Sequence, residues 1–152
     1  GEATLNPDLP KMIRFLNQRE IGAVIPTNGI YLTDKILYEL SQRPLLNKVQ
    51  VSIDGFESTH DFLRGAGSYK KTLSNIRLLK DTGVEVSANM VIHDGNYEEY
   101  IPLRKYFWNE YGITLGRMLY TSQNITSVSP INECRLKEFS EKRKLQAKKN
   151  WN

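Results

Sequence analysis

Two segments of this chain alternate polar and apolar residues with the period of a β-strand, and this pattern restricts the possible folds more than any other feature. In 48–54 and 85–92, one parity is apolar and the other is mostly polar. The polar set is Gln50, Ser52, Asp54, Glu85, Ser87 and Asn89. Strands of a parallel sheet are normally covered on both faces and are apolar throughout. A polar row on both segments therefore indicates a sheet with one helix-covered face and one open face.

Helix-like segments alternate with strand-like segments along the chain. Strands are expected within 23–29, 48–54, 84–92 and 113–120, where short apolar runs end at turn residues. Helices are expected after Asp8, after a cap at Thr33 or Asp34, after a cap at Ser68, and after the turn at 94–96. Pro44, Gly83 and Gly112 end the second, third and fourth of these helices. The segment between the second strand and Ser68 is expected to be a glycine-containing loop.

The crossovers between the predicted strands are short and helical, which implies a parallel sheet with right-handed connections and an α/β fold. In a doubly wound sheet, helices would cover the second face and make it apolar. The polar row instead favours a whole or partial βα barrel, with the row lining a ligand cavity. The fourth strand fits this pattern only in part, because Arg117 shares its parity with Leu115 and Leu119.

Composition narrows the class of protein further. The 152 residues are 39% hydrophobic and 25% charged, which suits one globular core rather than a disordered chain. The apolar runs are far shorter than the roughly 20 residues of a membrane-spanning helix, and no leader precedes them, so we expect a cytoplasmic protein without a membrane segment. The single cysteine, Cys134, cannot form an internal disulfide, and alone it cannot supply a structural zinc site or an iron–sulfur cluster.

Positive charge gathers near the carboxyl end of the sequence. The segment 135–149 contains seven Lys or Arg and two Glu, whereas the net charge of the whole chain is +4. The remainder is therefore close to neutral, which argues against a nucleic-acid platform. We predict a partial barrel domain in 1–121, and a linker with a basic helical tail in 122–152. The tail is either a solvated helix in which Leu136 and Phe139 dock weakly, or a partner-binding segment.

Several short motifs stand at the ends of the predicted strands. They are "GEATL" at 1–5, "TNG" at 27–29, "VSIDG" at 51–55, and a longer run over 59–92. Over roughly 1–121, their order and spacing resemble the radical S-adenosylmethionine (AdoMet) enzymes, and the longer run resembles the branch with a downstream SPASM extension. "GEATL" resembles the GGEP motif of that family, without its first glycine and with Ala3 in place of proline. It also reads as the end of a strand, so the chain is expected to be a piece of a longer protein.

The resemblance implies an enzyme in which a [4Fe–4S] cluster reduces AdoMet, and the resulting 5′-deoxyadenosyl radical abstracts hydrogen from a substrate. The CxxxCxxC cluster loop of the family precedes the GGEP motif and is absent from this sequence. The fragment alone is therefore expected to contain no metal ligands and no catalytic residue, and to be inactive. The expected substrate of the intact protein is a peptide, a protein or a cofactor precursor. The alternatives are a non-catalytic α/β binding module and an ordinary βα-barrel lyase or isomerase.

The resemblance also assigns AdoMet-binding roles at the carboxyl ends of the predicted strands. Gly1 and Glu2 match the motif that holds the methionyl amino group, a suitable task for a carboxylate and backbone carbonyls. Ser52 and Asp54 are expected to bind the methionyl carboxylate or the ribose. In the alternative interpretation, Glu2 belongs to a frayed terminus and Asp54 forms an Asx turn beside Gly55.

Two further residues complete the expected cofactor site. Arg64 is expected to pair with the methionyl carboxylate, and Asn89 to exchange hydrogen bonds with ribose hydroxyls. Arg64 is alternatively a surface arginine, and Asn89 alternatively bonds a neighbouring strand end. The sheet edge and lumen that missing strands would leave exposed are expected to favour self-association.

Two His-Asp pairs in the sequence invite a catalytic or metal-binding interpretation. For His60 with Asp61, a capping role is favoured over an acid–base pair. His93 with Asp94 lacks the further ligands that a metal site needs. Neither pair is therefore assigned to the site.

Overall fold

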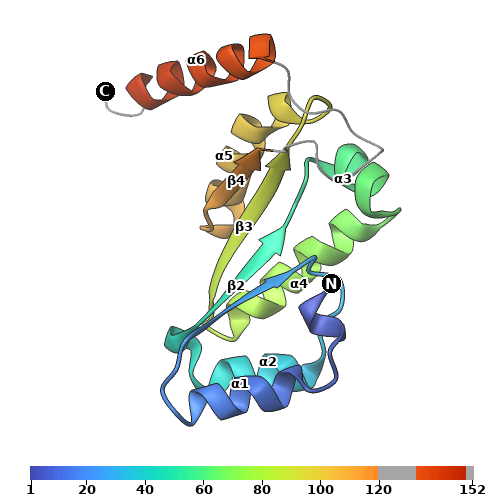
Figure 1. Ribbon diagram of the computed structural model, residues 1–152, viewed down its shortest axis with the longest axis vertical. Coiled ribbons are helices and arrows are strands. Elements are labelled where there is room, and N and C mark those ends of the chain that lie inside the picture. The colour runs from blue at the N-terminus through green and yellow to red at the C-terminus, as the bar shows by residue number, and fades with distance from the viewer. Residues whose placement is uncertain (120–132, 150–152) are drawn as a thin grey trace.

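The computed structural model describes residues 1–119 and 133–149, in which strands and helices alternate around one sheet (Figure 1). The strands are β1 (Ala23–Thr27), β2 (Asn47–Ser52), β3 (Glu85–Ile92) and β4 (Leu115–Leu119). The helices are α1 (Leu9–Asn17), α2 (Asp34–Gln42), α3 (Glu57–Arg64), α4 (Ser68–Asp81), α5 (Tyr100–Tyr111) and α6 (Glu133–Lys149). The 3-10 turns are η1 (Ala3–Leu5), η2 (Pro44–Leu46) and η3 (Tyr97–Glu99). Within the described ranges, no helix has the length and apolar character needed to cross a membrane.

The four strands are parallel and follow chain order across the sheet, from β1 to β4. In this register Thr27 lies beside Val51, and Val51 lies beside Ala88. The predicted α/β fold with parallel strands is therefore confirmed. Because the strands run the same way, their carboxyl ends at Thr27, Ser52, Ile92 and Leu119 meet along one edge of the sheet, here called the carboxyl edge.

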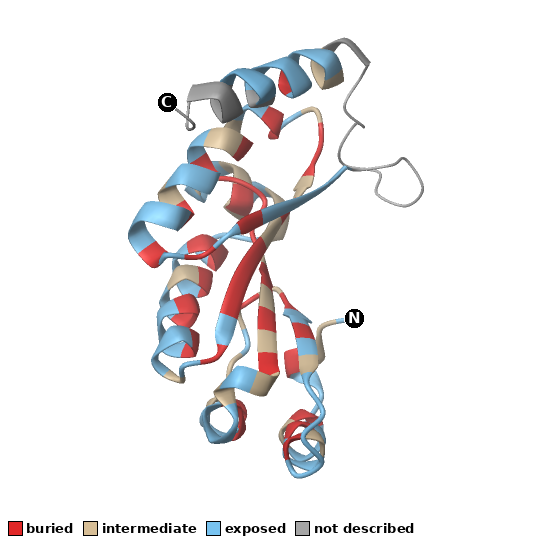
Figure 2. Cartoon of the chain, turned by 90° about the vertical axis from the view of Figure 1, so that its left-hand side faces the viewer, coloured by how far each residue is buried: buried red, intermediate tan, exposed pale blue. Residues whose placement is uncertain are grey.

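The apolar parity of the strands forms one side of the hydrophobic core. Val51 on β2 and Met90 on β3 are fully buried, and Ile76 of α4 and Phe107 of α5 are equally inaccessible. The helix α4 packs along β2 and β3, and α5 packs beside β4 (Figure 1). In Figure 2 the buried positions follow the strands and the sides of the helices turned toward them. Burial of this apolar surface holds the crossovers on one face of the sheet.

The opposite face of the sheet remains largely open, as the polar row predicted. Gln50, Ser52 and Asn89 are half-buried there, and Val24 on β1 is 63% exposed. Ser87 and Asp54 of this row are buried, and among the described residues the Ser87 hydroxyl has no hydrogen-bond partner. A sheet with helices on one face and a wet second face is a partial βα barrel rather than a doubly wound sheet.

The segment predicted as a glycine-containing loop contains the helix α3, so that prediction was wrong. The side chains within α3 give no local capping signal, since its N-cap residue, Phe56, makes no side-chain capping bond. The cap instead comes from Glu99, whose Oε2 accepts the Phe56 N–H at 2.6 Å and whose Oε1 accepts the Thr59 hydroxyl. A carboxylate at a helix N-terminus is favourable for the unpaired N–H groups and the helix dipole. Its distance in sequence explains why the helix escaped prediction.

The start of α4 also differs from the expected cap at Ser68. Its N-cap is Gly67, in a left-handed conformation with φ of 78°. Asp61 supplies the capping acceptor, because its oxygens accept the Gly67 N–H, the Tyr69 N–H and the Ser68 hydroxyl. These bonds lower the pKa of Asp61, the Tyr69 N–H contributing most. The predicted capping role within the His60–Asp61 pair is thus confirmed for Asp61. At α2 the predicted cap at Thr33 is also found, with its hydroxyl accepting the Ile36 N–H.

The described part of the basic tail is a helix that packs on the domain. Phe139 of α6 is only 3% exposed and meets Tyr100 edge-on at a centroid distance of 5.6 Å. Arg135 pairs with the carboxylate of Asp94 at 2.8 Å. Arg117, which shares the apolar parity of Leu115 and Leu119, places its guanidinium carbon 5.8 Å from the centroid of the Phe139 ring. The predicted division at 121/122 lies outside the described residues and stays a prediction.

Candidate functional site

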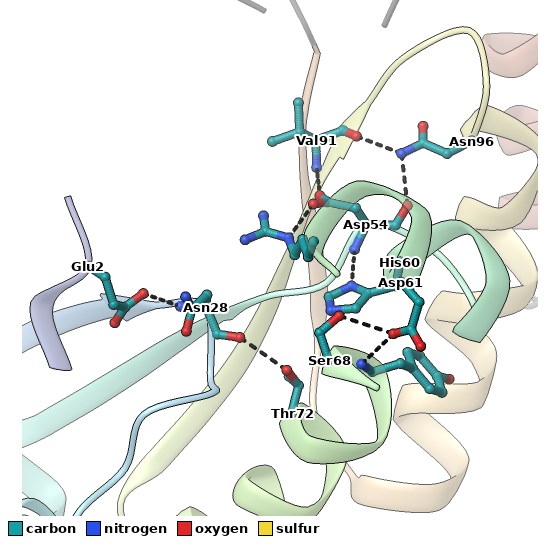
Figure 3. Close-up of polar contacts among 11 residues, drawn as sticks. Glu2, Asn28, Asp54, His60, Asp61, Ser68, Thr72, Val91 and Asn96 are labelled. Carbon is teal, nitrogen blue, oxygen red and sulfur yellow. Dashed lines mark hydrogen bonds and ion pairs between the residues drawn. The ribbon is translucent and has the colours of Figure 1, made fainter. Parts of the chain in front are cut away.

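The polar residues at the carboxyl edge form two connected groups, one around Glu2 and one around Asp54 (Figure 3). The first group joins η1 to the end of β1, and the second joins β2, α3 and the turn after β3. Ser52 and Asn89 are direct neighbours on β2 and β3. Ligands of parallel sheets collect at this edge, so these groups are the candidate site.

Glu2 is fixed by hydrogen bonds rather than frayed. Its Oε1 accepts bonds from the Thr4 N–H at 3.1 Å, the Thr4 hydroxyl at 2.6 Å and the Thr27 hydroxyl at 2.7 Å. Its Oε2 accepts the Asn28 N–H at 2.7 Å. Partial burial would raise the pKa of Glu2, but the bonds from Thr4, Thr27 and Asn28 outweigh it and lower the pKa. The carboxylate is therefore charged at neutral pH.

The same contacts explain the conformation of the first residues. They were expected to end a strand, but Ala3–Leu5 form the 3-10 turn η1. Glu2 acts as its N-cap, because the carboxylate accepts the Thr4 N–H two residues later. Gly1 precedes this turn and is exposed. The strand expectation failed because a side chain competes with a sheet ladder for this backbone.

Each residue of the motif "TNG" has a separate physical task. The Thr27 hydroxyl donates to Glu2 and accepts the Gly29 N–H at 3.0 Å. The Asn28 Oδ1 accepts the Ile30 N–H at 2.9 Å, which forms an Asx turn. Gly29 has a φ of 75°, and a Cβ there would lie 2.8 Å from a methyl carbon of Val51. The motif thus turns the chain sharply while presenting an N–H and a hydroxyl to Glu2.

Asp54 is bonded through its main chain and its side chain. Its N–H donates to Nδ1 of His60 at 3.1 Å, and its carbonyl accepts Nδ2 of Asn96 at 2.9 Å. Its Oδ2 pairs with Nε of Arg64 at 2.6 Å, and its Oδ1 accepts the Val91 N–H at 3.2 Å. These partners come from α3, β3 and the turn after β3, so Asp54 joins three elements. The alternative Asx turn at Asp54 is not formed.

This arrangement ends the backbone ladder between β2 and β3. The ladder continues as far as the Ile53 N–H, which donates to the carbonyl of Asn89 at 2.9 Å. Beyond it, Val91 bonds side chains instead: its N–H donates to Asp54 and its carbonyl accepts Nδ2 of Asn96 at 2.9 Å. Sequence reasoning placed Asn96 only in a turn. Its "DGN" context gave no sign that both strands would bond its amide.

Arg64 is held at the carboxyl edge rather than spread on the surface. Its side chain is 26% exposed, and that of Asp54 is 9% exposed. Asp54 engages Nε, and the described contacts give the two terminal guanidinium nitrogens no other partner, so they can bind a second anion. A planar guanidinium presented in this way suits a carboxylate or a phosphate.

Ser52 and Asn89 are brought together as predicted. They are register partners on the open face, and both are half-buried. The partner of Asn89 on β4 is Gly116, where a Cβ would lie only 3.0 Å from Oδ1 of Asn89. A glycine at this position therefore leaves room for the Asn89 amide. Asn89 has the strand parity of the open face, and the described contacts contain no side-chain hydrogen bond from it to a neighbouring strand end.

The residues of the remaining His-Asp pair, His93 and Asp94, each bond groups within the protein. Nδ1 of His93 accepts the Gly95 N–H at 3.1 Å, and Asp94 pairs with Arg135. Within 1–119 and 133–149, no cluster of three or more His, Cys, Asp or Glu residues has the arrangement of a metal site.

A one-sided parallel sheet with an ion-paired carboxyl edge defines the chain as a partial βα barrel of the kind that binds ligands at its strand ends. Residues 1–104 match the sequence model of the Radical SAM superfamily. The chain belongs to this superfamily, and the resemblance seen in its motifs is confirmed.

Relatives and solved structures agree with this assignment. The chain is 30% identical over 100 residues to the Fe-coproporphyrin III synthase of Methanosarcina barkeri, covering 65% of this chain and 25% of that protein. It is 36% identical over 98 residues to a serine-type anaerobic sulfatase-maturating enzyme of Bacteroides thetaiotaomicron, covering 62% and 23%. Streptococcus suis SuiB, in a crystal structure with bound S-adenosylmethionine, shares the fold with a TM-score of 0.74 at 16% identity, covering 99% and 36%. The chain thus spans about a quarter of the length of these curated relatives.

Proposed function

We propose that this chain forms part of the AdoMet-binding wall of a radical AdoMet enzyme. The observation that carries this proposal is the Asp54–Arg64 pair, held at the carboxyl edge beside the open, polar strand positions Ser52 and Asn89. Membership of the Radical SAM superfamily supports the ligand, and the bound cofactor in the SuiB structure is consistent with it.

Each chemical group of AdoMet is assigned to residues that can bind it. The methionyl ammonium is assigned to Glu2 and the carbonyl of Gly1, since Oε2 of Glu2 accepts one described hydrogen bond and retains a free lone pair. The methionyl carboxylate is assigned to the free end of the Arg64 guanidinium. The ribose hydroxyls are assigned to Ser52 and Asn89.

For Asp54 we propose a different role from the expected direct contact with the methionyl carboxylate or the ribose. Both of its carboxylate oxygens are already engaged, by Arg64 and by the Val91 N–H. We therefore assign Asp54 to the support of Arg64. Its negative charge keeps the guanidinium from folding away into solvent when no ligand is bound.

The chain does not by itself fit the second cofactor of the family. A [4Fe–4S] cluster needs several thiolate ligands, and the sequence contains the single cysteine Cys134. We propose that the intact protein holds this cluster elsewhere. When bound to the intact protein, the cluster and AdoMet supply a 5′-deoxyadenosyl radical for hydrogen abstraction, while the residues described here bind and orient AdoMet.

The substrate is assigned only by class. By their names, one relative synthesises Fe-coproporphyrin III and another matures a sulfatase. We propose a peptide, a protein or a cofactor precursor as the substrate of the intact protein. The open face of the sheet is the surface that such a substrate would approach.

Replacing Arg64 by lysine is the direct test of the proposed cofactor site. AdoMet binding is measured by calorimetry on the chain extended at its amino end through its native sequence. We expect Arg64→Lys to weaken binding by about tenfold or more, because an ammonium cannot pair with Asp54 and a carboxylate in the same fork geometry. Arg104→Lys, on the exposed side of α5, is the matched control and should bind AdoMet as the unchanged chain does.

Equal affinities of the unchanged chain and Arg64→Lys would contradict the site. Failure of the extended chain to bind AdoMet at all would contradict the function. Tight binding of a partner by the 152-residue chain, without AdoMet, would favour a non-catalytic binding module instead.

Self-association of the chain is a further part of the proposal. The edge strand β1 presents Val24, 63% exposed, on the open face, and unpaired strand edges template pairing with other chains. We expect light scattering to show a mass that rises with concentration and falls again in Val24→Lys. Leu45→Lys is the matched control, because Leu45 is 96% exposed on η2, outside the sheet. A constant monomer mass over the whole concentration range would contradict this prediction.

A further inference from the structure

His60 is a buried, polar residue that the proposed site does not use. It lies on α3 with no solvent exposure, and its ring packs edge-on against Tyr69 at a centroid distance of 5.8 Å. Its Nδ1 accepts the N–H of Asp54 at 3.1 Å (Figure 3). Only an unprotonated nitrogen can accept this bond, so the imidazole is neutral and carries its proton on Nε2. That Nε2 has no hydrogen-bond partner among the described residues.

The helix α3 reaches Asp54 at two points. His60 and Arg64 are four residues apart and so lie on the same face of the helix. His60 holds the main-chain N–H of Asp54, whereas Arg64 holds its carboxylate. A single ion pair would let the two side chains pivot about one contact. Two contacts on one residue fix both the position and the direction of the pair.

We propose that His60 is a positioning residue for ligand binding, which aims the Arg64 guanidinium by fixing the backbone of Asp54. This inference rests on the proposed function, since it takes Arg64 to be the contact for the methionyl carboxylate. The rest of Asp54 is bonded from the other side, by Asn96 and by the Val91 N–H. Among the described contacts, the bond to His60 is therefore the hydrogen bond that ties the main chain of Asp54 to the helix bearing Arg64.

The choice of histidine follows from the geometry of this bond. The site needs a buried acceptor that reaches the Asp54 N–H, and the ring also fills the space beside Tyr69. Asparagine can place its Oδ1 close to the position of Nδ1. Glutamine carries its oxygen one bond farther, near the position of Nε2, and leucine fills similar space without an acceptor. These three residues separate the hydrogen bond from the packing.

The test compares His60→Asn, His60→Leu and His60→Gln in the amino-terminally extended chain, with AdoMet as the titrated ligand. We expect His60→Leu and His60→Gln to weaken AdoMet binding by about tenfold, the effect typical of losing a supporting hydrogen bond behind a ligand contact. His60→Asn should restore most of the affinity. NMR spectra of the ¹⁵N-labelled 152-residue chain provide a second measurement. The chemical shifts of the Arg64 Nε–H and the Asp54 amide should differ from those of the unchanged chain in His60→Leu and His60→Gln, and should be close to them in His60→Asn.

The possible results separate this inference from the proposed function. If Arg64→Lys weakens AdoMet binding and all three His60 variants bind normally, the positioning role is wrong and the function stands. If Arg64→Lys also binds normally, the site assignment itself is wrong. A merely structural His60 would lose stability in all three variants without a difference in affinity between His60→Asn and His60→Gln. If His60→Leu does not fold, the AdoMet affinities of His60→Asn and His60→Gln decide whether His60 has the positioning role.

Discussion

Replacing Gly55 by alanine is expected to lower the free energy of unfolding by about 3 kcal/mol or more. Gly55 has a φ of 154°, in a region that residues with a Cβ rarely adopt. A Cβ there would also lie 2.5 Å from Oε2 of Glu99 and 2.7 Å from Cβ of Thr59. Glu99 cannot retreat without releasing its bonds to the Phe56 N–H and the Thr59 hydroxyl. Chemical denaturation of the 152-residue chain measures the loss.

Gly65 provides the matched control for this prediction. Its φ of 104° is also positive, but no atom lies within 4 Å of a Cβ built there. Gly65→Ala therefore reports backbone strain alone, about 1–3 kcal/mol, without the collision. The prediction requires Gly55→Ala to be clearly the more destabilised of the two. Equal losses would mean that the contact with Glu99 has no energetic weight.

The free energy of unfolding is expected to fall by roughly 3 kcal/mol between pH 6.5 and pH 4 because of His60. Burial, with a further contribution from the charge of Arg64, lowers the pKa of His60 from 6.5 to about 4. In this window the unfolded chain binds a proton at His60 and the folded chain does not. The free energy of unfolding is therefore unaffected by the protonation of His60 above about pH 6.5, and it decreases as the pH falls toward 4. Below the folded-state pKa, His60 causes no further decrease.

The comparison of the unchanged chain with His60→Asn isolates this contribution. His93, whose pKa is also lowered chiefly by burial, adds a slope of the same sign in both proteins. Glu2 and Asp61, whose pKa values are lowered as well, lose their contributions at more acidic pH in both. The free energy of unfolding is measured by denaturation at a series of pH values and plotted against pH for both proteins. The two plots should differ in slope only between pH 6.5 and 4. Parallel curves through this range would contradict the burial of a neutral imidazole.

Much of the fold could be predicted because its signals are local. The parity of Val51 and Met90 alone assigned one face to the core, and both residues are fully buried. The same parity brought Ser52 and Asn89 side by side, since equal parity on adjacent parallel strands places residues on one face. Periodicity of this kind needs no knowledge of distant contacts.

What escaped prediction depends on contacts between distant residues. The helix α3 takes its cap from Glu99, and η1 bonds through Glu2 to the Thr27 hydroxyl and the Asn28 N–H. Neither pairing leaves a trace in the local sequence. The partner of Arg64 was hidden for the same reason, because Asp54 faces it only after α3 folds back over the end of β2.

The place where side chains replace the ladder between β2 and β3 has a wider consequence. Past Ile53, the spacing of the two chains is set by the carboxylate of Asp54 and the amide of Asn96 rather than by direct pairing of main-chain groups. A hydrogen-bonded sheet has a fixed strand separation, but a gap bridged by side chains takes its width from their length. Aspartate to glutamate or asparagine to glutamine would alter that width by one methylene. We therefore expect such single substitutions to change the spacing of the two chains at the carboxyl edge, while the hydrogen-bonded sheet beneath it keeps its dimensions.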